Sequence, residues 1–279
     1  MSTAFFLPLD GVDRFCVYHP PAGNVAAARG LVYLHPFGEE MNKSRRMAAL
    51  QSRRFAAAGC AVLQIDLYGC GDSGGEFGDA RWALWKRDAQ LALEWLRQRT
   101  GGPVGLWALR LAAMLAADVA RDPALAIEQL VLWQPVASGE QFLTQFLRTQ
   151  LAAEMLAGGA VQSRIQGLRA MLARGERLEI GGYDLHPELA SAIDALKLAE
   201  LSPVVERVHW LEVSAQAEPR PAPASERVLS AWRGRGAEID SSAVAGEPFW
   251  ATLEIAVCEA LLDATDKSWK KASSGRIAK

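Results

Sequence analysis

The stretch VGLWALRLAA, residues 104–113, decides the fold. An apolar run from Val104 to Trp107 leads into a short segment centred on Arg110, and an alanine- and leucine-rich stretch follows. A buried strand that turns sharply into a helix has this outline. Ala108 and Ala112 let the strand and the helix pack closely, although alanine tolerates a positive φ less well than glycine. The residues therefore predict a strand–turn–helix unit with Arg110 at the turn.

The same alternation extends in both directions along the chain. Strands are expected at residues 14–21, 30–38, 61–69, 103–109, 127–136, 207–213 and 237–244, and helices at 44–60, 80–99, 110–122, 225–232 and 249–265. Strands that alternate with helices build a mostly parallel, doubly wound sheet with helices on both faces. Between Gly139 and Leu201 strand patterns are missing and glycines interrupt the chain, which predicts an all-helical insertion over the sheet edge.

These patterns divide the chain into four parts. Residues 1–138 and 202–266 form the two parts of an α/β core, and residues 139–201 form a helical cap. Residues 267–279 are basic and contain serine and glycine, so we expect a solvated, partly disordered tail there.

Composition and charge exclude several classes of protein. The 279 residues are 50% hydrophobic, so the chain can bury a large core. The net charge is −2, so the chain lacks the strong positive charge that is typical of nucleic-acid-binding proteins. No segment approaches the ~18 uninterrupted apolar residues of a transmembrane helix, and the N-terminus lacks the features of a signal peptide. We expect a soluble, cytoplasmic protein that is not an integral membrane protein.

The cysteines do not form a recognisable framework. Cys16, Cys60, Cys70 and Cys258 are scattered and show no CxxC spacing, which is typical of reduced thiols in a cytoplasmic protein. No His, Asp or Glu spacing matches a metal site, so neither a metal nor another cofactor is predicted. The sequence leaves the oligomeric state open.

Chemistry is expected in the segments that follow the strands, because open parallel sheets bind ligands beyond the carboxyl ends of their strands. These segments are residues 35–40, 66–73, 109–111, 133–135, 218 and 246–250. Phe142 and Phe146, at helical spacing in the insertion, are expected to lie over this edge as part of a lid.

Several motifs resemble known proteins. The stretch DLYGCGDSGG, residues 66–75, is similar to a loop common in the α/β-hydrolase superfamily. More narrowly, LHPFGEEMNKSRRM, DLYGCGDSGGEF, LWALRLAA, LWQPV, QFLRTQLAAEML and GEPFWATLEI together resemble the exosortase A system-associated hydrolase 2 family, from about Phe5 to Thr265. The resemblance implies an α/β-hydrolase fold with a helical lid, encoded near bacterial exopolysaccharide and PEP-CTERM protein-sorting genes.

The resemblance also implies a degenerate triad. Arg110 stands where related hydrolases carry a nucleophilic serine, and a guanidinium is neither a nucleophile nor a useful base. The histidine should follow the final strand, but no histidine occurs after His209, and only Glu218 follows the strand expected to supply the acid. The residues therefore do not support Ser-His-Asp catalysis and suggest a pseudoenzyme, a hydrolase by descent.

Two roles for Arg110 remain open. It binds the anionic group of a ligand, or it forms an internal ion pair with Glu39, Glu40 or Asp72. The predicted binding residues are Arg110, Leu111, His35, Phe37, Gly38, Glu39, Glu40, Asp72, Gln134 and Glu247.

Three functions follow from this site. The first is binding of a small molecule, an anionic sugar or an acyl intermediate of polysaccharide assembly. The second is an active hydrolase or acyltransferase that uses Cys70 or Ser73 as nucleophile with His35 as base. The third is a non-catalytic scaffold that binds a pathway protein through the lid, which an apolar patch on the insertion would favour.

Overall fold

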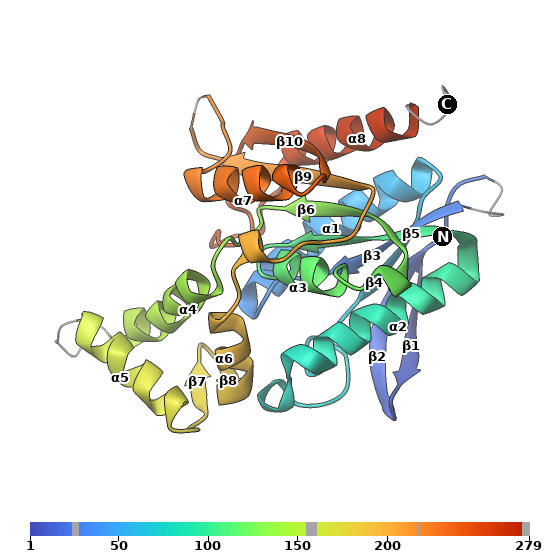
Figure 1. Cartoon of the computed structure of the whole chain (residues 1–279). Helices are drawn as coiled ribbons and strands as arrows, with labels where there is room; N and C mark the ends of the chain where they lie inside the picture. The colour runs from blue at the N-terminus through green and yellow to red at the C-terminus, as the bar shows by residue number, and fades with distance from the viewer. Residues whose placement is uncertain (24–27, 155–160, 217, 275–279) are drawn as a thin grey trace.

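A computed structural model describes residues 1–23, 28–154, 161–216 and 218–274. Its centre is an eight-stranded sheet in the order β1-β2-β4-β3-β5-β6-β9-β10 (Figure 1). The strands are β1 (Thr3–Leu9), β2 (Val12–His19), β3 (Ala28–Leu34), β4 (Ala61–Ile65), β5 (Gly101–Leu109), β6 (Ile127–Trp133), β9 (Arg207–Ser214) and β10 (Glu238–Ala245). The pairs β1–β2 and β2–β4 are antiparallel, and the other described strand pairs of this sheet are parallel. The predicted mostly parallel sheet is confirmed.

The first strand, β1, is missing from the strands expected from the sequence. It forms an antiparallel hairpin with β2 through Asp10 and Gly11, which have φ values of 49° and 81°. An Asp-Gly pair with two positive φ angles is the turn that two-residue hairpins favour. The alternating exposure of β1 fits an edge strand with one face in water.

Helices cover both faces of the sheet (Figure 1). One face packs against α2 (Trp82–Thr100), α3 (Ala112–Val119) and α7 (Pro223–Gly234), and the other against α1 (Glu39–Ala57) and α8 (Glu259–Ser274). Each face has its own buried apolar cluster. The second cluster includes Trp107 and Trp133, whose rings lie 4.8 Å apart. Trp133 is therefore a core residue and not a wall of an open pocket.

The C-terminal helix corrects two expectations. It begins at Glu259 and not near Phe249, because Phe249 and Trp250 are buried in a loop that packs against the sheet. It then continues through residues 267–274, which the sequence assigned to a disordered tail. Trp269 is buried, and its ring centroid lies 5.0 Å from that of Phe55 on α1. Burial of this indole explains why the helix extends; the end of the predicted tail, residues 275–279, lies outside the described residues.

The insertion contains α4 (Gly139–Glu154), α5 (Val161–Ala173), β7 (Leu178–Ile180), β8 (Tyr183–Leu185) and α6 (Pro187–Asp194). The expectation of helices only is wrong for residues 178–185, where β7 and β8 form an antiparallel hairpin. Gly181 and Gly182 make its turn with φ values of 56° and 84°. They read as helix breaks in the sequence, but a Gly-Gly pair between two short apolar segments also fits a hairpin.

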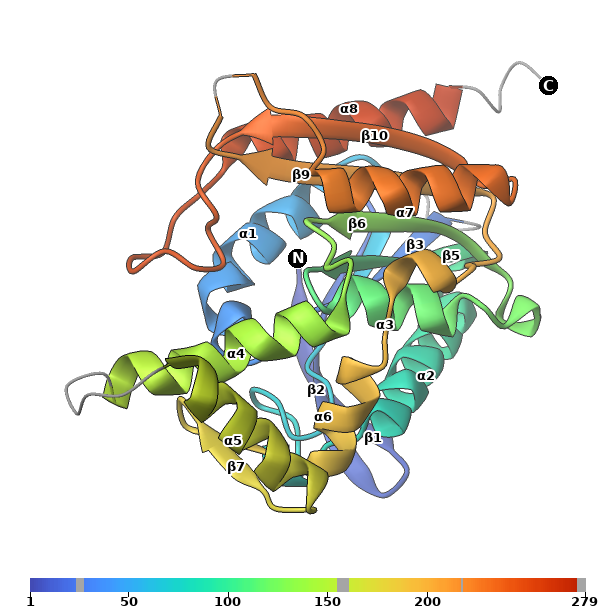
Figure 2. The same cartoon turned by 60° about the vertical axis from the view of Figure 1, so that its left-hand side comes forward.

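The two ends of the insertion meet. The Gly139 N–H donates to the Leu196 carbonyl at 2.9 Å, and the Leu198 N–H donates to the Ala137 carbonyl at 3.0 Å. A Cβ on Gly139 would collide with the carbonyl of Ile193, so only glycine permits this approach. Figure 2 shows α4, α5, β7 and α6 gathered at one end of the sheet. Within the described part of the chain, the helices are too short or too polar to cross a membrane.

The burial of Trp269 on α8 predicts how its removal changes the free energy of unfolding. Trp269→Ala should lower the free energy of unfolding by about 3 kcal/mol, because it removes a large buried side chain and leaves a cavity. Chemical unfolding followed by circular dichroism measures this change. The exposed neighbour Lys267 provides the control: Lys267→Ala should change stability by no more than about 0.5 kcal/mol. Equal stability of the two variants would contradict the buried position of Trp269.

Candidate functional site

The turn predicted at Arg110 is present. β5 ends at Leu109, Arg110 has a φ of 60°, and α3 begins at Ala112. The Arg110 N–H donates to the Trp133 carbonyl at 3.0 Å, and the Arg110 carbonyl accepts from the Ala113 N–H at 3.1 Å. A left-handed conformation is strained for a residue other than glycine, and proteins keep such residues where the surroundings hold them. Alanines at 108 and 112 are therefore compatible with the tight turn.

The guanidinium of Arg110 contacts a carboxylate and an aromatic ring. Its Nε–H donates to Oε1 of Glu40 at 3.2 Å, and its central carbon lies 5.3 Å from the ring centroid of Trp250. Glu40 is thus the partner among the three carboxylates that the sequence offered. Asp72 is exposed, and its backbone N–H donates to Asp66. Arg110 has several side-chain N–H groups. Within the described residues, Nε–H is the only one of these groups that has a protein acceptor.

Glu40 lies in the first turn of α1, next to Glu39. Carboxylates are favoured there because the helix dipole places partial positive charge at its N-terminus. Burial nevertheless raises the pKa of Glu40, against the lowering effect of Arg110. Among the described residues, Oε2 of Glu40 is buried and has no hydrogen-bond partner. Glu39 accepts from Asn42 at 2.9 Å and from the Tyr183 hydroxyl at 3.4 Å.

A cavity of about 380 Å³ lies between this ion pair and the insertion. Its lining combines the loop after β3, the start of α1, the elbow at Arg110, helix α4 and the hairpin β7–β8. The lining residues are Phe37, Glu39, Glu40, Arg110, Phe142, Gln145, Phe146, Ile180, Gly181 and Tyr183. The Phe37 ring packs edge-to-face on Phe142 and Phe146, with centroids 5.6 Å and 4.9 Å apart. The cavity is therefore mostly aromatic, with its charged groups at Arg110, Glu39 and Glu40.

His35 is not among the residues that line this cavity. Its Nδ1–H donates to the Pro36 carbonyl at 2.8 Å, and its Nε2 accepts from the Leu67 N–H at 3.1 Å. Burial lowers the pKa of His35. Both ring nitrogens are engaged with the backbone, so neither is free to accept a proton from a nucleophile. In this arrangement the imidazole fixes the shape of two loops.

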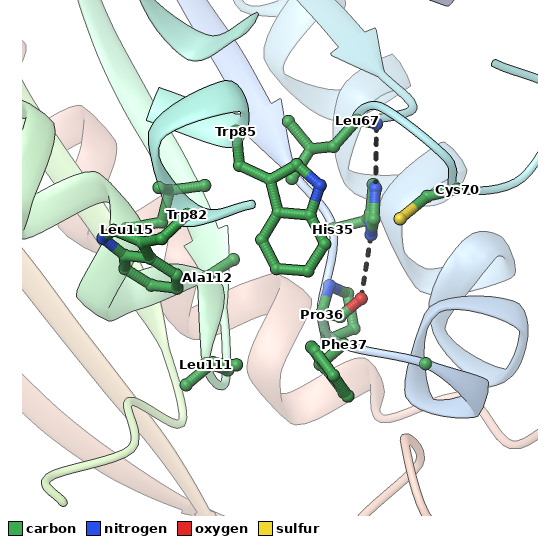
Figure 3. A pocket seen from close by; sticks show the side chains of 11 residues that line it. His35, Pro36, Phe37, Leu67, Cys70, Trp82, Trp85, Leu111, Ala112 and Leu115 are labelled. Carbon is green, nitrogen blue, oxygen red and sulfur yellow. Dashed lines mark hydrogen bonds between the residues drawn. The ribbon is translucent and has the colours of Figure 1, made fainter. Parts of the chain in front are cut away.

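His35 lies instead beside a second cavity of only about 10 Å³. Gly38, Leu111 and Cys70 also line this space, together with Trp82 and Trp85 (Figure 3). A space of this volume holds at most about one water molecule. Of the predicted binding residues, His35, Gly38 and Leu111 therefore line this small space and not the larger cavity.

The two proposed nucleophiles are buried in the loop after β4. Burial raises the pKa of the Cys70 thiol, and the carboxylates of Asp66 and Asp88 raise it further. The Ser73 hydroxyl donates to the Asp66 carbonyl at 2.5 Å and accepts from the Phe15 N–H at 2.8 Å. Gly71 has a φ of 56°, and a Cβ there would collide with the Asp66 carboxylate. Hydrogen bonds and tight packing thus fix this loop.

Three predicted residues lie away from the large cavity. Gln134 has a φ of 44°, and its side-chain Oε1 accepts from the Val213 N–H at 2.7 Å, which ties the end of β6 to β9. Glu247 is exposed, and its backbone carbonyl accepts from the Phe249 N–H. Glu218, the only candidate for the triad acid, is an exposed residue paired with Arg220. Among the described residues, no group of three or more His, Cys, Asp or Glu side chains could hold a metal ion.

Sequence reasoning missed several groups of the site. Gln145, Ile180, Gly181 and Tyr183 line the cavity, and the last three come from the hairpin that the sequence assigned to helices. The Gly-Gly turn was the signal that could have found them. Trp250 is buried, and its ring centroid lies 5.3 Å from the guanidinium carbon of Arg110. It follows β10, the place where the resemblance expects the triad histidine.

Comparison with known proteins identifies the fold. No family model matches the chain, and no curated protein matches its sequence. Among solved structures, it is similar to Est1E of Butyrivibrio proteoclasticus with ferulic acid bound, at 14% identity and a TM-score of 0.67, over 99% of this chain and 100% of the other. A thermostable carboxyl esterase of Bacillus coagulans matches at 11% identity and a TM-score of 0.65, over 98% of both chains. XC6422 of Xanthomonas campestris, a serine hydrolase without a lid, matches at 13% identity and a TM-score of 0.54, over 89% of this chain and 86% of the other. The chain has the α/β-hydrolase fold.

Proposed function

We propose that this α/β-hydrolase-fold protein binds a small molecule with an apolar acyl or aromatic body and an anionic end, without serine hydrolysis. The observation that carries the proposal is the cavity of about 380 Å³ that has Arg110 at its charged end. Ligand pockets commonly enclose about 300–1,000 Å³ and combine apolar walls with a few polar groups. We also propose that residues 139–201 act as the cap of this site.

The walls favour an acyl or aromatic body over a sugar. Phe37, Phe142, Phe146, Ile180 and Tyr183 supply most of the surface. Apart from the charged end, the polar side-chain groups of the lining are the Gln145 amide and the Tyr183 hydroxyl. A sugar would need many hydrogen-bond partners to replace its water, whereas an acyl chain or aromatic ring gains from leaving water.

The charged end favours an anion. Arg110 stays protonated at physiological pH and offers its Nη groups toward a ligand, since only its Nε–H bonds within the described protein. The guanidinium fork matches a carboxylate or phosphate in two parallel hydrogen bonds. The indole of Trp250 limits the directions in which the guanidinium can turn.

The alternative of an enzyme with another nucleophile finds little support in this geometry. Cys70 and Ser73 are buried, and His35 uses both ring nitrogens for backbone contacts. The other alternative is a scaffold that binds a pathway protein, and an apolar patch on the insertion would support it. Apart from residues 149–163, whose side chains the structure does not describe, the exposed large apolar side chains lie outside the insertion, at Met1, Phe6, Val204, Leu253 and Ile255.

A biological setting near exopolysaccharide and exosortase genes remains part of the proposal and rests on the sequence motifs alone. Est1E was solved with ferulic acid, an aromatic carboxylate. This makes ferulate a reasonable probe beside a simple acyl carboxylate such as octanoate, because each has an apolar body and one anionic end.

Binding of octanoate and ferulate should depend on Arg110. In isothermal titration calorimetry, Arg110→Gln should weaken binding of both carboxylates at least about tenfold, because a charge-assisted hydrogen bond is lost. The neutral analogues 1-octanol and methyl ferulate should bind wild type and variant with similar affinity. Equal affinity of wild type and Arg110→Gln for both carboxylates would contradict the proposal.

The variant needs a control for folding. Arg110→Gln leaves the Glu40 carboxylate without its cation, which can destabilise the protein. The double variant Arg110→Gln/Glu40→Gln removes both charges and should recover stability in thermal unfolding. It should still bind octanoate more weakly than the neutral analogue, since no cation remains at the site.

Active-site probes should fail to label the folded protein. We expect no fluorophosphonate adduct at Ser73, because both hydrogen-bonding roles of its hydroxyl are occupied. Iodoacetamide should leave Cys70 unmodified at neutral pH, because burial suppresses its thiolate. Mass spectrometry of the peptides checks both residues. Unfolding in guanidinium should make Cys70 reactive, and its rapid alkylation in the folded state would favour the enzyme alternative.

A further inference from the structure

The carboxyl group of Glu40 uses only one of its two oxygens. Oε1 accepts from Arg110, while Oε2 is buried and has no partner within the described residues. A buried polar atom without a hydrogen bond loses its water and receives nothing in return, which costs about 1–3 kcal/mol. Glu40 also lines the large cavity, and its side chain is 21% exposed, so a turn of the carboxyl group on binding can bring Oε2 to a bound molecule.

The charges around Glu40 oppose simple binding of an anion. Arg110 from the elbow faces it as the cation, and Glu39 from its own helix adds a second carboxylate. Tyr183 of β8 contributes a hydroxyl that bonds Glu39, and its pKa is raised to about 12. Helix α4 contributes Phe142, Gln145 and Phe146, and the loop after β10 contributes Trp250; none of these titrates. With both glutamates ionised, an incoming carboxylate meets more negative than positive charge.

We propose that Glu40 takes up one proton when an anionic ligand binds, and that its Oε2–H then donates to the ligand while the Nη groups of Arg110 hold the same anion. This inference rests on the proposed function of the cavity. The proton comes from solvent, and no covalent bond changes. Glu40 then selects for anions that accept a hydrogen bond from a neutral acid.

Two physical effects support this coupling. Burial already raises the pKa of Glu40 in the free protein, so its acid form is accessible at modest cost. A ligand carboxylate beside it would raise that pKa further, because like charges favour the neutral form. Affinity is therefore highest below the free-state pKa of Glu40. It falls as the pH rises from that value to the higher pKa in the complex, and becomes constant above it.

Calorimetric titration with octanoate from pH 5.5 to 9 tests the inference. In the window between the two pKa values, the affinity of the wild type should fall about tenfold per pH unit. Titrations in buffers of different ionisation enthalpy should show uptake of one proton per octanoate in that window. Ferulate should behave in the same way while its phenol remains neutral.

Two variants, at Glu40 and at the adjacent Glu39, show which carboxylate causes the pH dependence of octanoate binding. Glu40→Gln imitates the protonated acid, because its amide oxygen can accept from Arg110 and its N–H can donate to the ligand. It should bind octanoate at pH 8.5 as tightly as the wild type binds at low pH, with no proton uptake. The matched change Glu39→Gln should keep the uptake of one proton, although the pH window shifts because one carboxylate near Glu40 is lost.

The outcomes distinguish this inference from the proposed function. Binding that requires Arg110 but takes up no proton, or a Glu40→Gln variant that retains the pH dependence, overturns only the inference. Absence of octanoate and ferulate binding to the wild type at every pH overturns the inference together with the proposed function.

Discussion

The guanidinium of Arg110, fixed in a left-handed turn between β5 and α3, is the group on which the site depends. Its backbone N–H bonds Trp133, and its carbonyl accepts from Ala113, so the turn is tied to the neighbouring strand and to the helix. The side chain leaves this turn toward α1 and the loop after β10, where Glu40 and Trp250 meet it. A permanent positive charge held in this way needs a negative partner, and that requirement organises the cavity above it.

The proposed function gives this turn a role within the α/β-hydrolase fold. The sequence motifs imply that Arg110 stands at the elbow where related hydrolases carry a serine, and that Trp250 follows β10 where they carry a histidine. His35 and the loop after β4 are held by backbone hydrogen bonds and close packing. In the proposed function, the floor of the cavity recognises charge and does not carry out covalent attack.

Much of the core was predictable because its strands are continuous apolar runs, which only burial on both faces explains. The turn at Arg110 followed from the same pattern. Two hairpins were missed, although Asp10-Gly11 and Gly181-Gly182 mark their turns. Strands β7 and β8 have only three residues each, and β1 carries apolar side chains at consecutive positions, so neither gives a clear alternating signal. The helix over residues 267–274 was missed because its stability comes from the burial of Trp269 against α1, a contact between distant segments.

The site was less predictable than the fold. The position of a residue after a strand does not determine where its side chain points. Arg110, Glu40 and Phe37 line one cavity. Gln134 turns to the backbone of β9, His35 to the loop after β4, and Glu247 lies at the surface. The residues that the insertion contributes to the cavity could not be identified from the sequence, because they depend on where the insertion folds back over the sheet. Among three carboxylates, only the three-dimensional arrangement selected Glu40.

A crystal structure of the protein with octanoate bound would show which groups hold its carboxylate. We expect the alkyl chain among Phe37, Phe142 and Phe146, with the carboxylate within hydrogen-bonding distance of both the Nη groups of Arg110 and Oε2 of Glu40. A carboxylate that points to solvent, or that binds elsewhere while the cavity stays empty, would overturn recognition of the anion by Arg110.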